Sequence, residues 1–141
     1  MAIKQISVFV ENKKGALSDI VKMISGADIN LRALSIADTK DFGILRMIVS
    51  DTEKTKAALS DDVIVNITEV VAVKMSDKEG ALYTILKVLD EAEINIDYSY
   101  AFTGSKEGAY VVLRVDNVET AEKLLKDKGF ATLSDSDMSE I

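Results

Sequence analysis

The sequence contains no histidine, cysteine, tryptophan or proline among its 141 residues. Without His or Cys side chains, the common zinc and iron–sulfur sites, Ser–His catalytic arrangements and thiolate nucleophiles are excluded. Disulfides are excluded for the same reason, so cysteine usage gives no indication of secretion. We therefore expect no metal centre and no cofactor, and any catalysis would have to use Asp, Glu, Lys or Tyr.

Positive charge is also scarce in this chain. Lys and Arg together number 17 against 24 Asp and Glu, which gives a formal net charge of −7. This balance opposes binding to phosphate backbones and anionic membranes. No apolar run approaches the roughly 20 residues of a membrane helix, and the start MAIKQISVFVENKK lacks the layout of a signal peptide. We expect a cytoplasmic protein that binds neither nucleic acid nor a membrane.

The chain contains an internal repeat, which indicates two copies of one folding unit. A constant shift superimposes NKKGAL (residues 12–17) on DKEGAL (77–82) and ADIN (27–30) on AEIN (92–95). The same shift, without a gap, places Gly43 on Gly108 and Asp51 on Asp116. We predict a first domain over residues 1–67 and a second over 68–133, followed by an acidic tail over 134–141 without regular structure.

Each copy shows the same order of predicted elements. Alternating apolar residues over 6–10 and 71–73 predict a first strand, and the glycine of the motif precedes a helix with one apolar stripe. A second strand starts at about Asn30 or Asn95, a third follows Gly43 or Gly108, and a short helix capped by Asp51 or Asp116 precedes a fourth strand. The order β-α-β-β-α-β predicts an α+β fold of two tandem ferredoxin-like domains, each an antiparallel sheet with its helices on one face.

The third predicted strand of each copy is apolar on both faces. Ile44 and Ile48 lie opposite the core-facing residues in the first copy, and Tyr110 and Val112 do so in the second. A sheet covered by helices on one side should carry polar residues on the other. This pattern predicts that another protein surface covers the open face, as in a homodimer.

The repeated Asn/Asp-x-x-Gly-Ala-Leu motif is the first candidate for a binding site. Gly15 and Gly80 allow a tight turn and the close approach of a ligand, and the N–H groups of a helix N-terminus favour an anion such as a carboxylate. Asn30 and Asn95 each follow an apolar pair at the start of the second strand, where an amide offers both a donor and an acceptor. The alternative is that Asn12 and Asp77 only close turns or cap the helix and that Asn30 and Asn95 only end a turn. The residues leave both interpretations open.

The two copies differ in charge beside these asparagines. Arg32 stands two residues after Asn30, and Asp97 stands two residues after Asn95. One positive and one negative group would suit an oriented zwitterion, whereas a surface ion pair worth less than about 1 kcal/mol is the simpler explanation.

These motifs and the order of elements resemble the ACT domain, a small-molecule-sensing module of enzymes in amino-acid metabolism. The resemblance covers essentially the whole chain as two tandem copies, as in small two-ACT proteins without a catalytic domain. It implies a non-catalytic regulatory protein that binds an amino acid between neighbouring ACT units and acts on a metabolic enzyme. It also implies ligand contacts from the loop after the first strand and from the start of the second strand: Asn12, Gly15, Ala16, Leu17, Asn30 and Arg32 in the first copy, and Asp77, Gly80, Ala81, Leu82, Asn95 and Asp97 in the second.

Three other functions compete with this hypothesis. The first is a regulatory subunit that is held against an unidentified metabolic enzyme and has no ligand of its own. The second is RNA binding by the same element order, which requires exposed aromatics on the first and third strands and a basic surface. The first strand of the second copy, VVAVKM, has no aromatic residue, and the net charge has the wrong sign. The third is an enzyme, but no convergent acid–base pair is visible.

Overall fold

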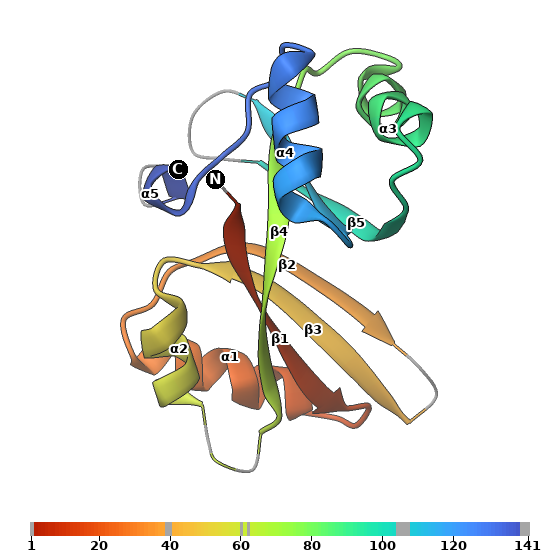
Figure 1. Ribbon diagram of the computed structural model, residues 1–141. Helices are drawn as coiled ribbons and strands as arrows, with labels where there is room; N and C mark the ends of the chain where they lie inside the picture. Colours follow the sequence, from red (N-terminus) through yellow and green to blue (C-terminus); the bar gives the residue numbers. More distant parts are fainter. Residues whose placement is uncertain (1, 39–40, 60, 62, 104–107, 139–141) are drawn as a thin grey trace. The chain divides into compact units, whose positions relative to one another are not determined.

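The chain forms two compact units, shown in the computed structural model of Figure 1, which describes residues 2–38, 41–59, 61, 63–103 and 108–138. The first unit is Lys4–Thr68, and the second unit is Glu69–Ile141 together with Met1–Ile3. This division falls one residue after the predicted boundary at 67/68. The grouping of the N-terminal residues differs from the prediction, because Ala2 packs against the core of the second unit.

The first unit is a sheet with two helices. Its strands are β1 (Ile3–Glu11), β2 (Leu31–Asp38), β3 (Phe42–Val49) and the start of β4 (Val65–Met75), and its helices are α1 (Ala16–Gly26) and α2 (Thr52–Ala58). The strand order is β2-β3-β1-β4, and β3 runs antiparallel to both of its neighbours. Because β1 and β2 are both antiparallel to β3, they run in the same direction, and α1 carries the chain back between them.

The second unit repeats this arrangement, except that its predicted fourth strand is reduced to a single bridge. The remainder of β4 is followed by α3 (Ala81–Glu91), β5 (Ile96–Thr103), β6 (Ala109–Val115) and α4 (Val118–Asp127), with the strand order β4-β6-β5. The predicted fourth strand shrinks to one bridge between Val73 and Thr132, beside a hydrogen bond of 2.9 Å from the Leu133 N–H to the Ala72 carbonyl. The prediction of an α+β fold with two tandem ferredoxin-like domains is confirmed.

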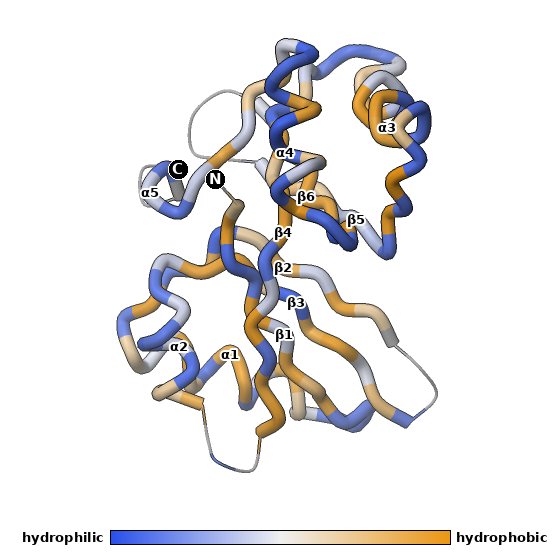
Figure 2. Tube along the Cα trace, in the orientation of Figure 1, coloured by the Kyte–Doolittle hydropathy of each residue, from blue (hydrophilic) through white to orange (hydrophobic). Residues whose placement is uncertain are grey.

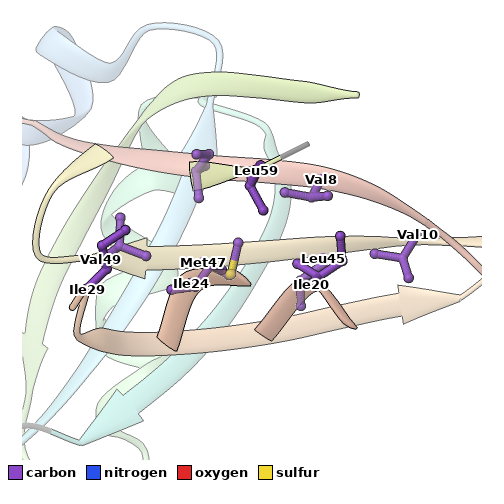
Figure 3. Close-up of a cluster of buried hydrophobic side chains, with 10 residues drawn as sticks. Val8, Val10, Ile20, Ile24, Ile29, Leu45, Met47, Val49 and Leu59 are labelled. Atoms are coloured by element: carbon purple, nitrogen blue, oxygen red, sulfur yellow. The ribbon is translucent and has the colours of Figure 1, made fainter. Parts of the chain in front are cut away.

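Each unit has its own core between the sheet and the helices. In the first unit, alternate residues of β1 and β3 meet residues of α1 that lie one helical turn apart, and these side chains are drawn in Figure 3: Val8, Val10, Ile20, Ile24, Leu45 and Met47. In the second unit the corresponding positions are Val73, Ile85, Leu89, Val111 and Leu113, joined by Val71, the counterpart of Ile6. Hydrophobic and hydrophilic residues mix along the helices in Figure 2, as expected for helices with one buried stripe.

The two copies differ in length at the hairpin between their second and third strands. Val10 pairs with Gly43, whereas Met75, which the repeat aligns with Val10, pairs with Ala109. The gapless alignment is therefore wrong after this hairpin, because the second copy has one additional residue there. The helix caps show the same offset. Asp51 caps α2 as predicted, by accepting from the Lys54 N–H at 3.0 Å, but Asn117 rather than Asp116 caps α4.

The sheet faces opposite the helices are less open than the sequence suggested. Ile48 and Val112 are buried within the single chain, at 1% and 0% exposure, and Ile44 is half-buried. In the second unit Phe102 and Tyr110 are also buried on this face, with stacked rings 5.3 Å apart. The expectation that a second protein must cover Val112 is therefore wrong, because the chain already buries this residue.

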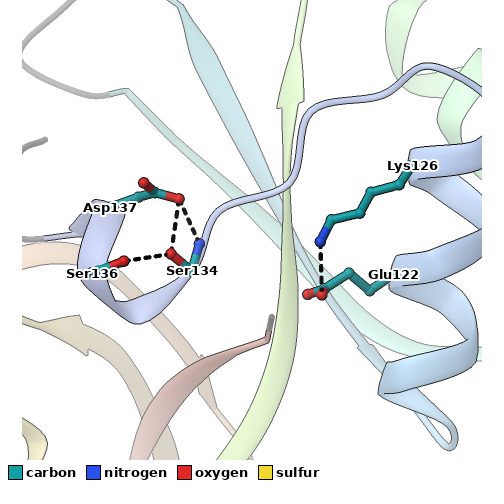
Figure 4. Close-up of polar contacts among 5 residues, drawn as sticks. All are labelled: Glu122, Lys126, Ser134, Ser136 and Asp137. Atoms are coloured by element: carbon teal, nitrogen blue, oxygen red, sulfur yellow. Dashed lines mark hydrogen bonds and ion pairs between the residues drawn. The ribbon is translucent and has the colours of Figure 1, made fainter.

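The C-terminal segment contains a short helix where we predicted an irregular tail. Helix α5 (Asp135–Met138) begins after Ser134, whose N–H and hydroxyl both donate to the Asp137 carboxylate, at 2.9 and 3.0 Å (Figure 4). The Ser134 backbone N–H, followed by the Ser134 hydroxyl, lowers the pKa of Asp137 from its ordinary value. One polar turn is thus organised by a single carboxylate, and residues 139–141 of the predicted tail lie outside the described residues.

Candidate functional site

The motif glycines stand at the N-terminal ends of α1 and α3. Gly15 has φ 87° and Gly80 has φ 81°, which is the left-handed region that glycine adopts without strain. The N-cap position of each helix is the glycine itself, Gly15 or Gly80, which has no side chain to cap the helix. The first N–H group of each helix donates within its own loop, from Ala16 to the Lys13 carbonyl at 3.3 Å and from Ala81 to the Lys78 carbonyl at 3.2 Å. The next N–H groups of a first turn have no partner inside the helix.

Both loops place an apolar side chain in solvent beside these helix ends. Leu17 is 36% exposed and Leu82 is 42% exposed, although the sequence pattern assigned them to the buried stripes. Asn12 and Asp77 are exposed, and Ala16 and Ala81 are half-buried. In the second unit a cavity of about 350 Å³ adjoins this loop and is lined by Lys74, Ser76, Ala81, Thr84, Phe130 and Ala131. The loop candidates of each unit therefore lie together in one exposed region, at the N-terminal end of α1 or α3.

The strand-start candidates line a second kind of cavity, found in both units. Asn30 lines a cavity of about 440 Å³ between α1 and β2, together with Val21, Ser25, Asp28, Ile29 and Leu31. Asn95 lines a cavity of about 570 Å³ between α3 and β5, together with Tyr83, Leu86, Asp90, Glu93 and Ile94. Six of the positions in the two linings correspond through the repeat. We call these the strand-start cavities.

The two asparagines make different hydrogen bonds. The Asn30 N–H donates to the Ser50 hydroxyl at 3.0 Å, and the Ser50 N–H donates back to the Asn30 carbonyl at 3.0 Å. In the second unit the Asn95 side-chain amide donates to the Asp97 carboxylate at 3.2 Å. Asp97 therefore pairs within its own unit.

Arg32 and Asp97 both lie at a β-bulge. The pairing of β2 with β3 shifts between Leu31 and Ala33, and that of β5 with β6 shifts between Ile96 and Tyr98. A bulge breaks the strict alternation of side chains, so a spacing of two residues does not place Arg32 or Asp97 on the same strand face as the asparagine before it. Bulges are frequent beside functional sites, and here one occurs at the same place in both copies.

The loop and strand-start candidates of one unit lie at opposite ends of its sheet. The loop end is marked by the Asn12 N–H, which donates to the Asp41 carbonyl at 3.1 Å, beside the pair of Val10 and Gly43. Asn30 lies at the other end of β3, beside Val49 and Ser50. At about 3.4 Å per residue, β3 separates the two ends by roughly 20 Å. One amino acid therefore cannot reach both halves of the motif within one unit.

Two residues of these cavities could not be singled out from their types alone. Asp28 has φ 62° and Glu93 has φ 58°, and each follows the last residue of its helix by two positions. A non-glycine residue rarely adopts this conformation, and glutamate lacks the short side chain that lets Asp and Asn tolerate it. The sequence does carry one repeated sign of this conformation: in both copies an acidic residue stands just after the helix, where glycine is the usual residue.

Comparison with known proteins identifies the family. The family model described as an ACT domain pair matches residues 1–141, and the chain belongs to this family. Protein BT0572 from Bacteroides thetaiotaomicron has a similar structure, with 40% identity, a TM-score of 0.91, and coverage of 100% of this chain and 98% of that chain. A comparison with proteins of curated function finds no match.

More distant structures share the fold. The regulatory subunit of aspartate kinase from Thermus thermophilus has 11% identity and a TM-score of 0.65, with 89% of this chain and 92% of that chain covered. The aspartate kinase of Clostridium acetobutylicum has 17% identity and a TM-score of 0.54, with 89% and 33% covered. ACT domains are regulatory modules. Among the described residues, no helix has the length and apolar character to cross a membrane, and no group of acidic side chains is suited to hold a metal ion.

Proposed function

We propose that this chain is a non-catalytic regulatory protein that binds an amino acid between the ACT units of two copies. The observation that supports this most directly is the separation of roughly 20 Å between the loop and strand-start halves of the motif. A small ligand contacts both halves only if each comes from a different unit.

The edge of β2 offers a way to bring the two halves together. β2 has β3 on one side and stands at the end of the strand order of the first unit. On its helix-facing side Leu34 and Ile36 are each 48% exposed, and no lysine or proline protects this edge. The corresponding side of β5 carries Ser99 and Ala101 instead. The apolar edge therefore favours self-association through β2.

Antiparallel pairing of β2 with the β2 of a second copy would complete two sites. In such a pair, the start of one strand lies beside the end of the other. The end of β2 pairs with Gly43, which pairs in turn with Val10 beside the loop of residues 11–15. Asn30 of one copy would thus approach the loop and Gly15 of the other, and the homodimer would hold two equivalent ligands.

The groups at these two places suit a zwitterion. The N–H groups in the first turn of α1 that have no partner inside the helix, together with the positive end of its dipole, favour a carboxylate. The amide of Asn30 can donate to or accept from a ligand, and exposed Leu17 offers a contact for an apolar side chain. Ligand capture would shift the packing of the two copies and so the affinity for a metabolic enzyme in the cytoplasm, without nucleic acid or a membrane as a partner.

A thermal-shift screen against the twenty amino acids tests the proposal. A ligand that binds only the folded chain raises the melting temperature, by an amount that grows with its concentration. We expect one amino acid or a chemically related group to stabilise the chain. The Asn30→Ala variant should weaken that binding about tenfold or more, since a hydrogen bond to a charged group is worth about 1.5–3 kcal/mol. If no amino acid stabilises the chain at millimolar concentration, the proposal is wrong.

A second function is favoured by one surface of the first unit. Phe9 and Phe42 are 45% and 43% exposed, with ring centres 5.9 Å apart, and Ile64 is also exposed beside them. This patch has no counterpart in the second unit, where the repeat places Lys74 at the position of Phe9. A regulatory subunit held against an enzyme, with no ligand of its own, would use such a patch. Co-purification with a metabolic enzyme, together with no response to any amino acid, would support this alternative.

A further inference from the structure

An apolar patch lies on the sheet face of the first unit that is opposite its helices, which we call the open face. Phe9 and Phe42 point to this face because they alternate with the buried core residues of β1 and β3. The Phe9 N–H donates to the Ile64 carbonyl at 3.1 Å, which places Ile64 beside Phe9. The three side chains are 45%, 43% and 65% exposed in chain order. We call Phe9, Phe42 and Ile64 the open-face patch.

The second unit is polar at the same place. Its Lys74 N–H donates to the Ala131 carbonyl at 2.8 Å, which is the same backbone contact as that between Phe9 and Ile64. An exposed lysine and an exposed alanine therefore replace phenylalanine and isoleucine. Because both units have the same fold, the fold does not require the patch, and contiguous exposed apolar groups of this kind are typical of a contact surface.

The size of the patch indicates a weak contact. From their exposed fractions, the three side chains offer roughly 300 Å² of apolar surface. A stable interface buries about 800 Å² on each partner, and smaller contacts are transient. Such a contact becomes effective when one particle carries two patches that bind at the same time.

The distribution of charge favours a second first unit as the occupant of the patch. Residues 4–68 contain nine basic and nine acidic residues, whereas residues 69–141 contain eight basic and 15 acidic residues. The whole net charge of −7 therefore belongs to the second unit. Two first units meet without net repulsion, whereas two second units repel each other. A contact of the patch with the same patch of another copy also desolvates no charged group at its centre.

The homodimer paired through β2 would present two patches on one side. Antiparallel pairing of β2 with β2 relates two copies by an axis perpendicular to the sheet. The open faces of both first units then point in the same direction, so a second dimer can stack against both patches as two sheets do in a sandwich. For this dimer the inference rests on the proposed function.

We infer that the open-face patch binds the same patch of another copy, so that two β2-paired dimers stack into a tetramer. Each patch contact is small, so the tetramer forms at a higher protein concentration than the dimer does. A monomer offers a single patch and stays unassociated at the concentrations at which dimers stack.

Sedimentation velocity of the full chain from micromolar to submillimolar concentration tests the inference. The wild-type mass should rise from dimer towards tetramer. Phe9→Lys together with Ile64→Ala gives the first unit the side-chain types that the second unit has at these positions, so the fold should persist, which circular dichroism would check. This double variant should raise the dimer–tetramer dissociation constant about tenfold or more. Tyr83→Lys is the matched control, because it replaces a 67% exposed ring of the second unit and should sediment like the wild type.

A photo-crosslinking probe identifies the occupant of the patch. Replacement of Phe42 by benzoylphenylalanine keeps an aromatic side chain there and forms covalent links on illumination. We expect links to peptides of another copy that contain Phe9, Phe42 or Ile64. The same probe in a chain that also carries Leu34→Lys should give few links, because this chain is monomeric.

The outcomes separate this inference from the proposed function. Dimers that associate no further at submillimolar concentration, or a double variant that associates like the wild type, would overturn the inference and leave the proposed function intact. Links from position 42 to an enzyme in a cell extract, without links between copies, would also overturn it and would favour the regulatory-subunit alternative. Patch-dependent tetramers of a chain that no amino acid stabilises would support the inference and contradict the proposed function.

Discussion

Replacement of Glu93 by glycine should stabilise the chain, because Glu93 has a backbone conformation that suits glycine. Its φ is 58°, and its N–H donates to the Asp90 carbonyl at 2.9 Å while the Ile94 N–H donates to the Leu89 carbonyl at 2.9 Å. This is the hydrogen-bonded helix end at which glycine is the usual residue. Left-handed conformation costs a non-glycine residue roughly 1–2 kcal/mol, and the freedom of glycine in the unfolded chain offsets roughly 0.4–1 kcal/mol of that gain.

Loss of the carboxylate adds to this gain. A negative charge at a helix C-terminus is unfavourable by roughly 0.3–1 kcal/mol. The sum predicts that Glu93→Gly raises the free energy of unfolding by about 1 kcal/mol, or the melting temperature by about 3 °C for a chain of this length. Asp28→Gly should give about half as much, since aspartate tolerates this conformation better than glutamate does.

Urea and thermal unfolding followed by circular dichroism would measure both changes. Glu93→Gln is the control, because it removes the charge and keeps the strained backbone, and it should recover only the electrostatic part. A Glu93→Gly variant less stable than the wild type would refute the backbone argument. A more stable variant that no longer binds the amino acid identified by thermal shift would show that the strain is retained for binding.

Three further predictions concern the caps, the sheet and the C-terminal helix. Asn117→Ala should destabilise the chain by about 1 kcal/mol in urea unfolding, whereas Asp116→Ala should have little effect, because the Asn117 side chain accepts from the Thr120 N–H at 3.0 Å; the reverse order would contradict the assigned cap. Val112→Asp should unfold its unit, because it places a charge at a fully buried position. Leu34→Lys should keep the circular dichroism of the wild type and give monomers in sedimentation. A Leu34→Lys variant that remains a dimer would exclude the β2 edge as the dimer contact. The pKa of Asp137 is lowered in the folded state, so its stabilisation of α5 is present above the ordinary value of 3.8 and is lost as the pH falls through the folded value. The Ser134 amide shift should follow this titration, and Asp137→Asn should abolish it; a persistent titration in that variant would assign it to another group.

The fold was predictable because the same sequence patterns occur in both copies of the repeat, so that each copy supports the interpretation of the other. The apolar stripe of α1 recurs in α3, and the alternation of β1 recurs in β4, so two weak local patterns support one arrangement. The hairpin insertion was not predictable from identities alone, since Gly108 aligns with Gly43 by type but lies one position away in the pairing. Strand register depends on hydrogen bonds across the sheet, which a comparison along the chain does not include.

The candidate site was only partly predictable for a related reason. The motif correctly marked the glycines with positive φ and the asparagines beside the cavities. It could not show that Asn12 and Asn30 lie at opposite ends of β3, because proximity in the sequence says little about proximity across a β-α-β crossover. It also missed the bulges at Arg32 and Asp97, whose pattern differs from a regular strand by a single residue.

The central claim is that the loop of one copy and the strand start of another form a single site, and mixed dimers test it most directly. One chain carries Gly15→Asp and Gly80→Asp, which place a carboxylate at each helix N-terminus. Aspartate tolerates positive φ, and an added Cβ meets no atom within 4 Å at either glycine, so both variants should fold. The other chain carries Asn30→Ala and Asn95→Ala.

Neither variant alone should bind the amino acid identified by thermal shift. After unfolding and refolding as an equal mixture, about half of the dimers contain both chains, and one of the two sites in each mixed dimer is intact. Calorimetric titration should then recover about a quarter of the wild-type number of sites, with the wild-type affinity. A mixture that binds no more than the separate variants would contradict a site shared between two copies.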